Sequence, residues 1–246
     1  MSLAPTKGIV LRSVKYGETS LIVSIFTEGF GLQSYIINGL RGGGKKQGSR
    51  GNPFQPAALL DLVVYHQPQK NIQRIREYRW AQLYTQLYED VFKASVATFM
   101  VELLLKCLKE PESNPDLFYF MEDALLHLDR AGAPVVANYP IFFAVHLANF
   151  FGFRLSEEKE NGKQFLDLQE GRFLDQPPAH TQYLDPGASA VLSDLLKVMQ
   201  PAELEDFALT GMVRRQLLFS LESYYAYHLP DFGRLRSLPV LQEVLG

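Results

Sequence analysis

The chain has 246 residues, 47% of them hydrophobic and 21% charged, and its single cysteine excludes a disulfide framework and a cysteine-built zinc site. It contains no run of about 18 apolar residues and no basic-then-apolar leader, so we expect a cytoplasmic protein without a membrane span. The net charge of −3 hides a split, because the first 80 residues carry 11 Lys or Arg and 4 Asp or Glu, whereas the other 166 carry 13 and 23. A basic first part indicates a polyanionic partner.

The first part of the chain has the alternation and the turn spacing of short β-strands. We predict five strands, over residues 7–16, 19–27, 32–38, 57–66 and 71–80. The glycine-rich connection between the third and the fourth strand contains too many helix breakers to be helical. Five short antiparallel strands in about 75 residues predict a small closed barrel of the OB type, with an SH3-like barrel as the nearest alternative.

From residue 81 onward the hydrophobic period is helical. We predict helices over residues 81–109, 115–132, 138–151, 187–199, 201–228 and 238–245. Asn114 is expected to cap the second helix, with Pro115 at its first position. Residues 156–178 break the pattern, and 165–174 predict an inserted β-hairpin. The sequence therefore predicts an α+β protein, with an OB-type barrel domain over 1–80 and a mainly helical domain over 81–246.

The glycine-rich connection nearly matches a nucleotide-binding loop. Gly39 to Lys45 spells G-x-x-x-x-G-K, but Lys46 stands where a P-loop needs Ser or Thr, and no helix follows. The same glycines and cations suit a loop that follows a phosphodiester chain better than one that holds a nucleotide.

A basic groove with aromatic platforms is how small barrels hold single-stranded nucleic acid. We predict DNA contacts from Arg12, Lys15, Arg41, Lys45, Lys46, Arg50, Tyr16 and Tyr35. A second basic group consists of Lys70, Arg74, Arg76 and Arg79. Any single aromatic residue here, Phe54 included, is more typical of a core position, and strand charges are often only solvated.

Signs of catalysis are scarce. The five histidines show no metal-ligand spacing, and no nucleophile elbow or paired-carboxylate motif stands out. We therefore predict a protein that is not an enzyme and that uses no cofactor. In the acidic half, basic side chains are expected to rim an apolar pocket for an acidic peptide, with ordinary surface salt bridges as the alternative. These residues are Lys106, Lys109, Arg154, Arg214 and Arg215.

Several segments together resemble the RecO family of bacterial recombination mediators. The likeness is carried by Lys7–Arg12, Tyr16–Val23, Phe26–Thr27, Gly29–Phe30–Gly31, Gly39–Leu40–Arg41, Phe54–Gln55–Pro56, Arg215–Leu218, Tyr227–Leu229 and Ser237–Leu241. The resemblance implies a barrel followed by helices, no catalytic turnover, and binding and annealing of single-stranded DNA. It also implies displacement of single-strand-binding protein with the help of RecR, so that RecA can load. The acidic tail of single-strand-binding protein is expected to contact the helical domain.

One stretch departs from the pattern of that family. Many relatives carry a four-cysteine zinc motif in the helical domain, where this sequence has the hairpin 165–174 without a cysteine. We therefore expect no zinc, with Phe165, Leu168 and Phe173 packing in its place.

The mechanism that these features favour is electrostatic capture of DNA followed by exchange of partners, in a cytoplasmic, nucleoid-associated protein. Two other hypotheses stay open from the residues alone. One is an RNA-binding accessory factor, since OB barrels bind both nucleic acids, and the other is an adaptor that contacts only proteins.

Overall fold

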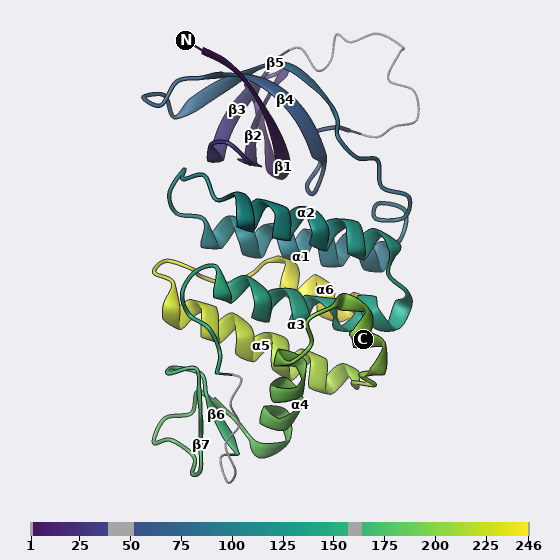
Figure 1. Ribbon diagram of the computed structural model, residues 1–246, viewed down its shortest axis with the longest axis vertical. Helices are drawn as coiled ribbons and strands as arrows, with labels where there is room; N and C mark the ends of the chain where they lie inside the picture. The colour runs from purple at the N-terminus through teal and green to yellow at the C-terminus, as the bar shows by residue number, and fades with distance from the viewer. Residues whose placement is uncertain (1, 39–51, 157–163, 246) are drawn as a thin grey trace. The chain divides into compact units, whose positions relative to one another are not determined.

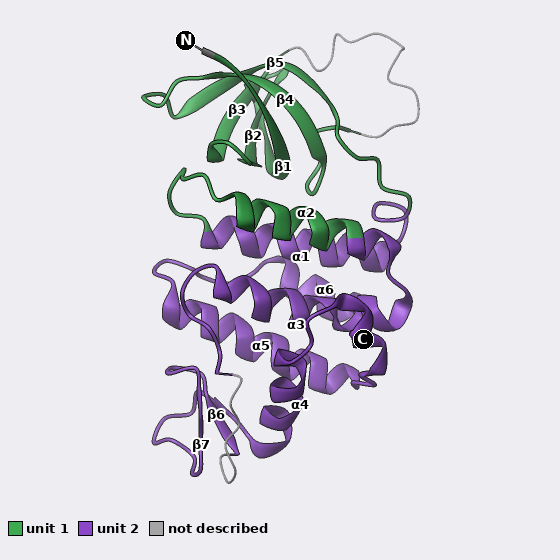
Figure 2. Ribbon diagram, in the orientation of Figure 1, with its two compact units in different colours: residues 1–85, 108–126 green, residues 86–107, 127–246 purple. Residues whose placement is uncertain are grey.

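The computed structural model describes residues 2–38, 52–156 and 164–245 (Figure 1). The chain packs as two compact units, which Figure 2 shows in different colours. The first unit consists of Met1–Thr85 and Leu108–Leu126, and the second consists of Gln86–Cys107 and His127–Gly246. The predicted α+β fold with an N-terminal barrel is confirmed. The boundary at residue 80 stays a prediction, and packing places residues 108–126 with the barrel strands.

Five strands of the first unit close into a barrel in the order β1-β2-β3-β5-β4. They are β1 (Ser2–Tyr16), β2 (Ser20–Thr27), β3 (Gly31–Ile37), β4 (Leu59–His66) and β5 (Ile72–Trp80). The first half of β1 pairs with β4 and its second half with β2, with an irregularity between Val10 and Arg12 where the strand changes partner. β3 and β5 pair in parallel, so the prediction of a wholly antiparallel barrel is wrong at this one junction. The connectivity is that of a Greek-key barrel of the OB type.

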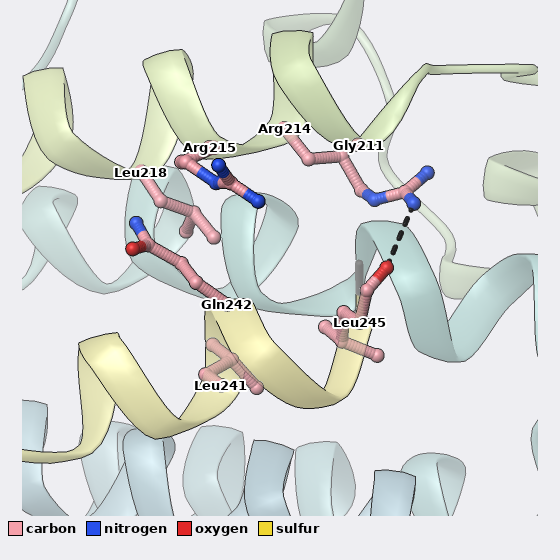
Figure 3. Close-up of a pocket in the computed structure, with 7 residues that line it drawn as sticks. All are labelled: Gly211, Arg214, Arg215, Leu218, Leu241, Gln242 and Leu245. Atoms are coloured by element: carbon pink, nitrogen blue, oxygen red, sulfur yellow. Dashed lines mark hydrogen bonds between the residues drawn. The ribbon is translucent and has the colours of Figure 1, made fainter.

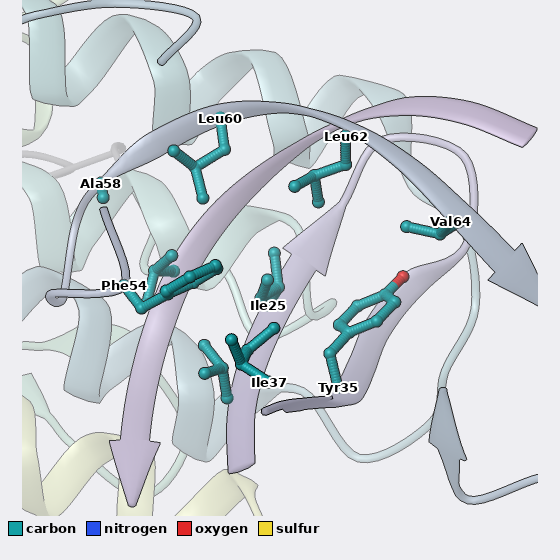
Figure 4. Close-up of a cluster of buried hydrophobic side chains, with 10 residues drawn as sticks. Ile25, Tyr35, Ile37, Phe54, Ala58, Leu60, Leu62 and Val64 are labelled. Atoms are coloured by element: carbon teal, nitrogen blue, oxygen red, sulfur yellow. The ribbon is translucent and has the colours of Figure 1, made fainter. Parts of the chain in front are cut away.

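Alternate side chains of the strands fill the barrel (Figure 4). The interior consists of Val10, Val23, Ile25, Tyr35, Ile37, Phe54, Ala58, Leu60, Leu62 and Val64. Phe54 enters from the segment before β4, where its backbone carbonyl accepts a hydrogen bond from Ser13 Oγ and its N–H donates to Asn52 Oδ1 at 3.0 Å. Burial of a phenylalanine contributes about 2–3 kcal/mol, so this side chain is part of what holds the barrel closed.

The start of helix α2 (Pro115–Arg130) packs against the outside of the barrel. The rings of Phe26 and Phe118 lie 5.8 Å apart, and Lys7 Nζ donates to Glu122 Oε1 at 2.8 Å. The predicted cap of this helix is confirmed, because Asn114 Oδ1 accepts the N–H of Leu117 at 3.0 Å. These contacts explain why residues 108–126 belong to the first unit.

The second unit is built around helix α3 (Ala133–Asn149), which is buried along most of its length. It begins at Ala133, with Gly132 as its N-cap residue and Pro134 in its first turn, and it continues through Pro140, so the predicted start at residue 138 is wrong. A proline at the second helical position is favourable, because its missing N–H has no partner to lose there. The other helical segments of this unit are α1 (Val91–Cys107), α4 (Pro186–Leu196), the 3₁₀ helix η1 (Pro201–Asp206), α5 (Gly211–His228) and α6 (Ser237–Leu245).

Two of the predicted helices, 81–109 and 201–228, are shorter than expected by ten residues or more. Residues 81–90 are not helical, because Asp129 Oδ1 accepts the backbone N–H groups of Gln86 and Leu87 at 2.8 and 2.7 Å, while Asp90 caps α1. The predicted helix 201–228 is two segments, since Thr210 adopts an extended backbone and caps α5. In both cases side-chain oxygens satisfy amides that a longer helix would have paired.

The predicted hairpin is present as β6 (Phe165–Asp167) and β7 (Arg172–Leu174), joined by the short strand β8 (Tyr183–Leu184), which the sequence did not reveal. Leu168 and Phe173 are buried, and Phe165 is half-buried against Tyr183. Within the described ranges, no three His, Cys, Asp or Glu side chains gather as a metal site would require. None of the described helices is long and apolar enough to cross a membrane.

Candidate nucleic-acid interface

One side of the barrel carries three open rows of outward side chains, which we call the outer face. The first two rows cross the strands β1, β2, β3 and β5 in register, and the third crosses β1 and β2. The outer face consists of Arg12, Ser24, Ser34 and Ile72 in the first row, Val14, Ile22, Ile36 and Arg74 in the second, and Tyr16 and Ser20 in the third. These residues point outward because their strand neighbours Val23, Tyr35 and Gln73 are buried.

The outer face has a simple chemistry. It holds two arginines, three serines, four aliphatic residues and one tyrosine, and no acidic residue. Arg12 and Arg74 are both exposed, and neither has an ion-pair partner among the described residues. They lie in adjacent rows on β1 and β5, about 14 Å apart across the strands and about 7 Å along them. Two unpaired cations on an acid-free surface favour an extended anionic ligand.

The other predicted cations of the barrel differ in availability. Lys15 is exposed, but it is in register with Leu21 and Ile37, so it lies on the opposite side of β1 from Arg12. Lys70 is exposed in the β4–β5 turn, which buried Gln73 fixes by donating to the carbonyls of Gln67 and Lys70 at 2.7 and 2.8 Å. The β1–β2 and β4–β5 loops are the ones with which OB barrels contact oligonucleotides.

Two arginines of the second basic group are already paired. Arg79 Nε lies 3.0 Å from Asp61 Oδ2, and Arg76 Nε lies 3.3 Å from Glu77 Oε1. Both pairs are exposed and therefore weak, but each local charge is offset. Arg74 and Lys70 are thus the members of this group best placed to attract a phosphate.

The two tyrosines predicted to contact DNA differ in their exposure. Tyr16 is 56% exposed at the end of the β1–β2 hairpin, whereas Tyr35 is 0% exposed inside the barrel. The prediction of Tyr35 as a DNA contact is therefore wrong, and burial raises the pKa of its hydroxyl. Tyr35 and Ile37 are two residues apart on one strand, so their side chains point to the same face of the sheet, and this alternation is the signal that marks Tyr35 as a core residue. Phe54 is a core residue as well, as expected for a single aromatic side chain.

The remaining predicted DNA contacts, Arg41, Lys45, Lys46 and Arg50, lie outside the described residues. Sequence reasoning overlooked the aliphatic members of the outer face: Val14, Ile22, Ile36 and Ile72. The available signal was a run of consecutive apolar residues, as in Leu21-Ile22-Val23, which places apolar side chains on both faces of the strand.

The cations predicted to bind a partner peptide lie on α1, on α5 and in the segments that follow α1 and α3. Lys106 Nζ donates to the carbonyl of Phe232 at 2.6 Å and lies 5.4 Å from the centre of its ring. Lys109 is exposed and belongs to the first unit, whereas exposed Arg154 belongs to the second. Lys106 is thus held by an internal carbonyl and has a structural role.

Arg214 and Arg215 line a small pocket between α5 and α6, with room for about one water molecule (Figure 3). Arg214 donates to the carbonyls of Leu209 and Leu245 at 2.5 and 3.0 Å, so it ties the end of α6 to the start of α5. Arg215 is exposed beside it. The two neighbouring arginines therefore differ, the first being structural and the second open to a partner.

Comparisons with known proteins cover nearly the whole chain. The family described as "Recombination protein O N terminal" matches residues 1–84, and the one described as "Recombination protein O C terminal" matches residues 88–239. A protein of Bacteroides fragilis called DNA repair protein RecO is 30% identical over 243 residues, which are 98% of this chain and 99% of that protein. Proteins of the same name from Phocaeicola vulgatus (29% over 244 residues, 99% and 100% of the two chains) and Flavobacterium psychrophilum (30% over 244 residues, 98% of each) are similar over comparable lengths.

Proposed function

The chain belongs to the RecO family of DNA repair proteins, and on this premise we propose that it is a recombination mediator that binds and anneals single-stranded DNA. In this proposal it helps to load RecA onto strands coated by single-strand-binding protein, together with RecR. The work needs no catalytic step and no cofactor. Its place is the cytoplasm, in association with the nucleoid.

The observation that carries the proposal is the pair of exposed arginines, without an ion-pair partner among the described residues, on the acid-free outer face of an OB-type barrel. Phosphate charge dominates the affinity of proteins for nucleic acid. Cations that offset the backbone charge of two complementary strands lower their mutual repulsion, so pairing accelerates without any covalent chemistry. We assign phosphate contacts to Arg12 and Arg74 and base stacking to Tyr16 on the outer face. Further contacts in this proposal come from Lys15, on the other side of β1, and from Arg41, Lys45, Lys46 and Arg50.

The helical segments supply the protein contacts in this proposal. Arg215, beside the α5–α6 pocket, is the cation best placed to meet the acidic tail of single-strand-binding protein, with Lys109 and Arg154 as further exposed cations. Residues 81–246 are acidic overall, so they are expected to repel DNA, which then binds the barrel.

Fluorescence anisotropy of a labelled single strand, titrated at several salt concentrations, tests the DNA-binding step. With four to six phosphate contacts, log affinity should fall with log salt at a slope of about −3 to −4. Reversing the charge of Lys45, Lys46 and Arg50 together should flatten that slope, whereas Arg172→Glu in the second unit is the control that should leave it unchanged. Binding of duplex or RNA in preference to single-stranded DNA, or no binding in dilute buffer, would refute the proposal.

The annealing and loading steps need separate assays. Complementary labelled strands coated with single-strand-binding protein should anneal faster when the protein is added. Arg215→Glu should slow this reaction and leave annealing of bare strands unchanged, because only the coated strands present the acidic tail. Equal effects on bare and coated strands would show that Arg215 does not contact the coating protein.

A further inference from the structure

A cavity of about 370 Å³ lies in the second unit, between the start of α1 and the start of α3. It is lined by residues from Gln86 to Lys93, by the first residues of α3 and by Leu245. Pockets that hold small molecules have volumes of about 300 Å³ and above, so the cavity has the size of a site for one small ligand. The proposed contacts with DNA and with the coating protein do not use it.

Lys93 brings a buried positive charge to this cavity. Its side chain belongs to a residue that is 3% exposed, and Nζ donates to Gln86 Oε1 at 2.6 Å and to the carbonyl of Asp129 at 2.8 Å. Both acceptors are neutral, because the carboxylate of Asp129 accepts the amides of Gln86 and Leu87 instead. An ammonium group has three N–H donors, so one is left for a ligand. A buried cation held only by neutral groups favours an anionic ligand.

The start of α3 lines the same cavity and also favours an anion. Gly132 is the N-cap residue, and no side chain caps this helix of 17 residues. Pro134 has no N–H, so the amides of Gly132, Ala133 and Val135 are the donors at this end. Gly132 and Ala133 are exposed and line the cavity. The amides of a helix start beside a lysine form a favourable site for a phosphate.

Two further side chains of the cavity suit the rest of a nucleotide. Phe92 is 46% exposed, and an exposed aromatic ring is a surface on which a base stacks. Asp90 caps α1 through Oδ1, which accepts the amides of Phe92 and Lys93 at 2.8 and 3.1 Å. Its Oδ2 is therefore left to accept a hydroxyl, as acidic side chains accept ribose hydroxyls in dinucleotide-binding proteins.

We infer that this cavity binds a nucleoside monophosphate, with its phosphate at Lys93 and the start of α3, its ribose at Asp90 and its base against Phe92. An apolar carboxylic acid would also meet Lys93, but it would leave the carboxylate of Asp90 facing apolar groups, which is unfavourable. The inference goes beyond the proposed function and does not depend on it, because the residues of the two sites do not overlap.

Isothermal titration calorimetry of the full chain with adenosine 5′-monophosphate tests the inference, and ribose 5-phosphate is the probe without a base. Lys93→Met should weaken the binding of both compounds by about tenfold, because both carry the phosphate. Phe92→Ala should weaken the binding of the nucleotide by about tenfold and leave that of ribose 5-phosphate unchanged. Phe219→Ala in α5 is the matched control, since Phe219 is 47% exposed and lies outside the cavity, and it should change neither affinity.

Hydrogen exchange locates the bound nucleotide. It should slow exchange over residues 86–93 and 131–137. Slower exchange on the barrel strands instead, or loss of binding in a variant with both Arg12→Gln and Arg74→Gln, would place the nucleotide on the outer face and overturn the inference. Equal affinity for inorganic phosphate and for the nucleotide would overturn it as well, since the base and the ribose would then contribute nothing.

A second variant covers the case in which the substitution of buried Lys93 prevents folding. Ala137→Phe fills the cavity with a larger side chain and keeps Lys93, Asp90 and Phe92. This variant should lose the binding of adenosine 5′-monophosphate, and far-UV circular dichroism confirms that it is folded. A folded Ala137→Phe variant that binds as tightly as the unchanged protein would show that the cavity is not the site.

Discussion

Gly31, at the start of β3, is the position where a single added methyl group should separate the barrel from α2. Its φ of +63° favours glycine, and a Cβ placed there would lie 2.5 Å from the carbonyl carbon of Glu112, 2.9 Å from its nitrogen and closer still to its oxygen. The obstructing atoms are main chain, so no change of rotamer relieves the overlap. The segment that leads into α2 has to move away.

The expected loss of stability for Gly31→Ala follows from three effects. Alanine in the left-handed region costs about 1 kcal/mol. Displacement of the Glu112 segment breaks the hydrogen bond from Ser113 Oγ to the carbonyl of Glu28, 2.8 Å long and contributing about 1 kcal/mol. It also weakens the contact between the rings of Phe26 and Phe118 by about another 1 kcal/mol. We therefore expect a loss of about 3 kcal/mol in the free energy of unfolding.

Urea unfolding measures this loss, and the single tryptophan makes the measurement specific to the first unit. Trp80 lies at the end of β5 and packs against the barrel core, so its fluorescence reports unfolding of the barrel. Gly17→Ala is the matched control, because Gly17 has nearly the same φ, +65°, with no atom within 4 Å of the added Cβ. That variant should lose only about 1 kcal/mol. Equal losses for the two variants would refute the packing of residue 112 on β3.

Three further predictions concern the second unit. Asp185→Ala should lower the free energy of unfolding by about 1 kcal/mol, because Asp185 caps α4. Hydrogen bonds from the Ala188 N–H and the Gln216 amide lower the pKa of the Asp185 carboxyl, so this stabilisation is present above pH 3.8 and is lost as the pH falls through the lowered pKa. The urea midpoints of the variant and the unchanged protein should therefore converge in acid. Burial raises the pKa of the Tyr224 hydroxyl from 10.0 to about 12, so the stability that the neutral hydroxyl contributes is complete below pH 10 and is lost as the pH rises toward 12. In Tyr224→Phe, the free energy of unfolding should therefore fall less steeply with pH in the alkaline range. An unchanged dependence on pH would contradict this. Arg214→Gln should release the end of α6 by removing the hydrogen bond to the Leu245 carbonyl, seen as faster hydrogen exchange over residues 237–245, while Arg215→Gln should leave that exchange unchanged.

Local pattern was sufficient to place the barrel strands, except that β1 begins at Ser2 and not at the predicted residue 7. Alternation along β2 and β3 and the turn residues between them gave strands within two residues of those observed, because both signals act within a few residues of the chain. Asn114 as a cap is a similar case, since a cap depends on its next three residues. Tyr35 could have been assigned to the core by the same alternation. The non-helical residues 81–90 could not have been predicted locally, because the carboxylate that satisfies their amides is that of Asp129.

The sequence alone determined the class of fold and the family, since composition, charge and short-range pattern are properties of the chain itself. Only the tertiary structure decided which cations are available. Arg74 and Arg79 are both arginines of one predicted strand, but Asp61 on another strand forms an ion pair with Arg79. In the same way, the carbonyl of Leu245 accepts a hydrogen bond from Arg214, whereas Arg215 is exposed. The outer face itself exists because β3 meets β5 and because α2 covers only the neighbouring row that contains Phe26. Such contacts join segments far apart in the chain, and no local pattern encodes which distant group reaches a given side chain.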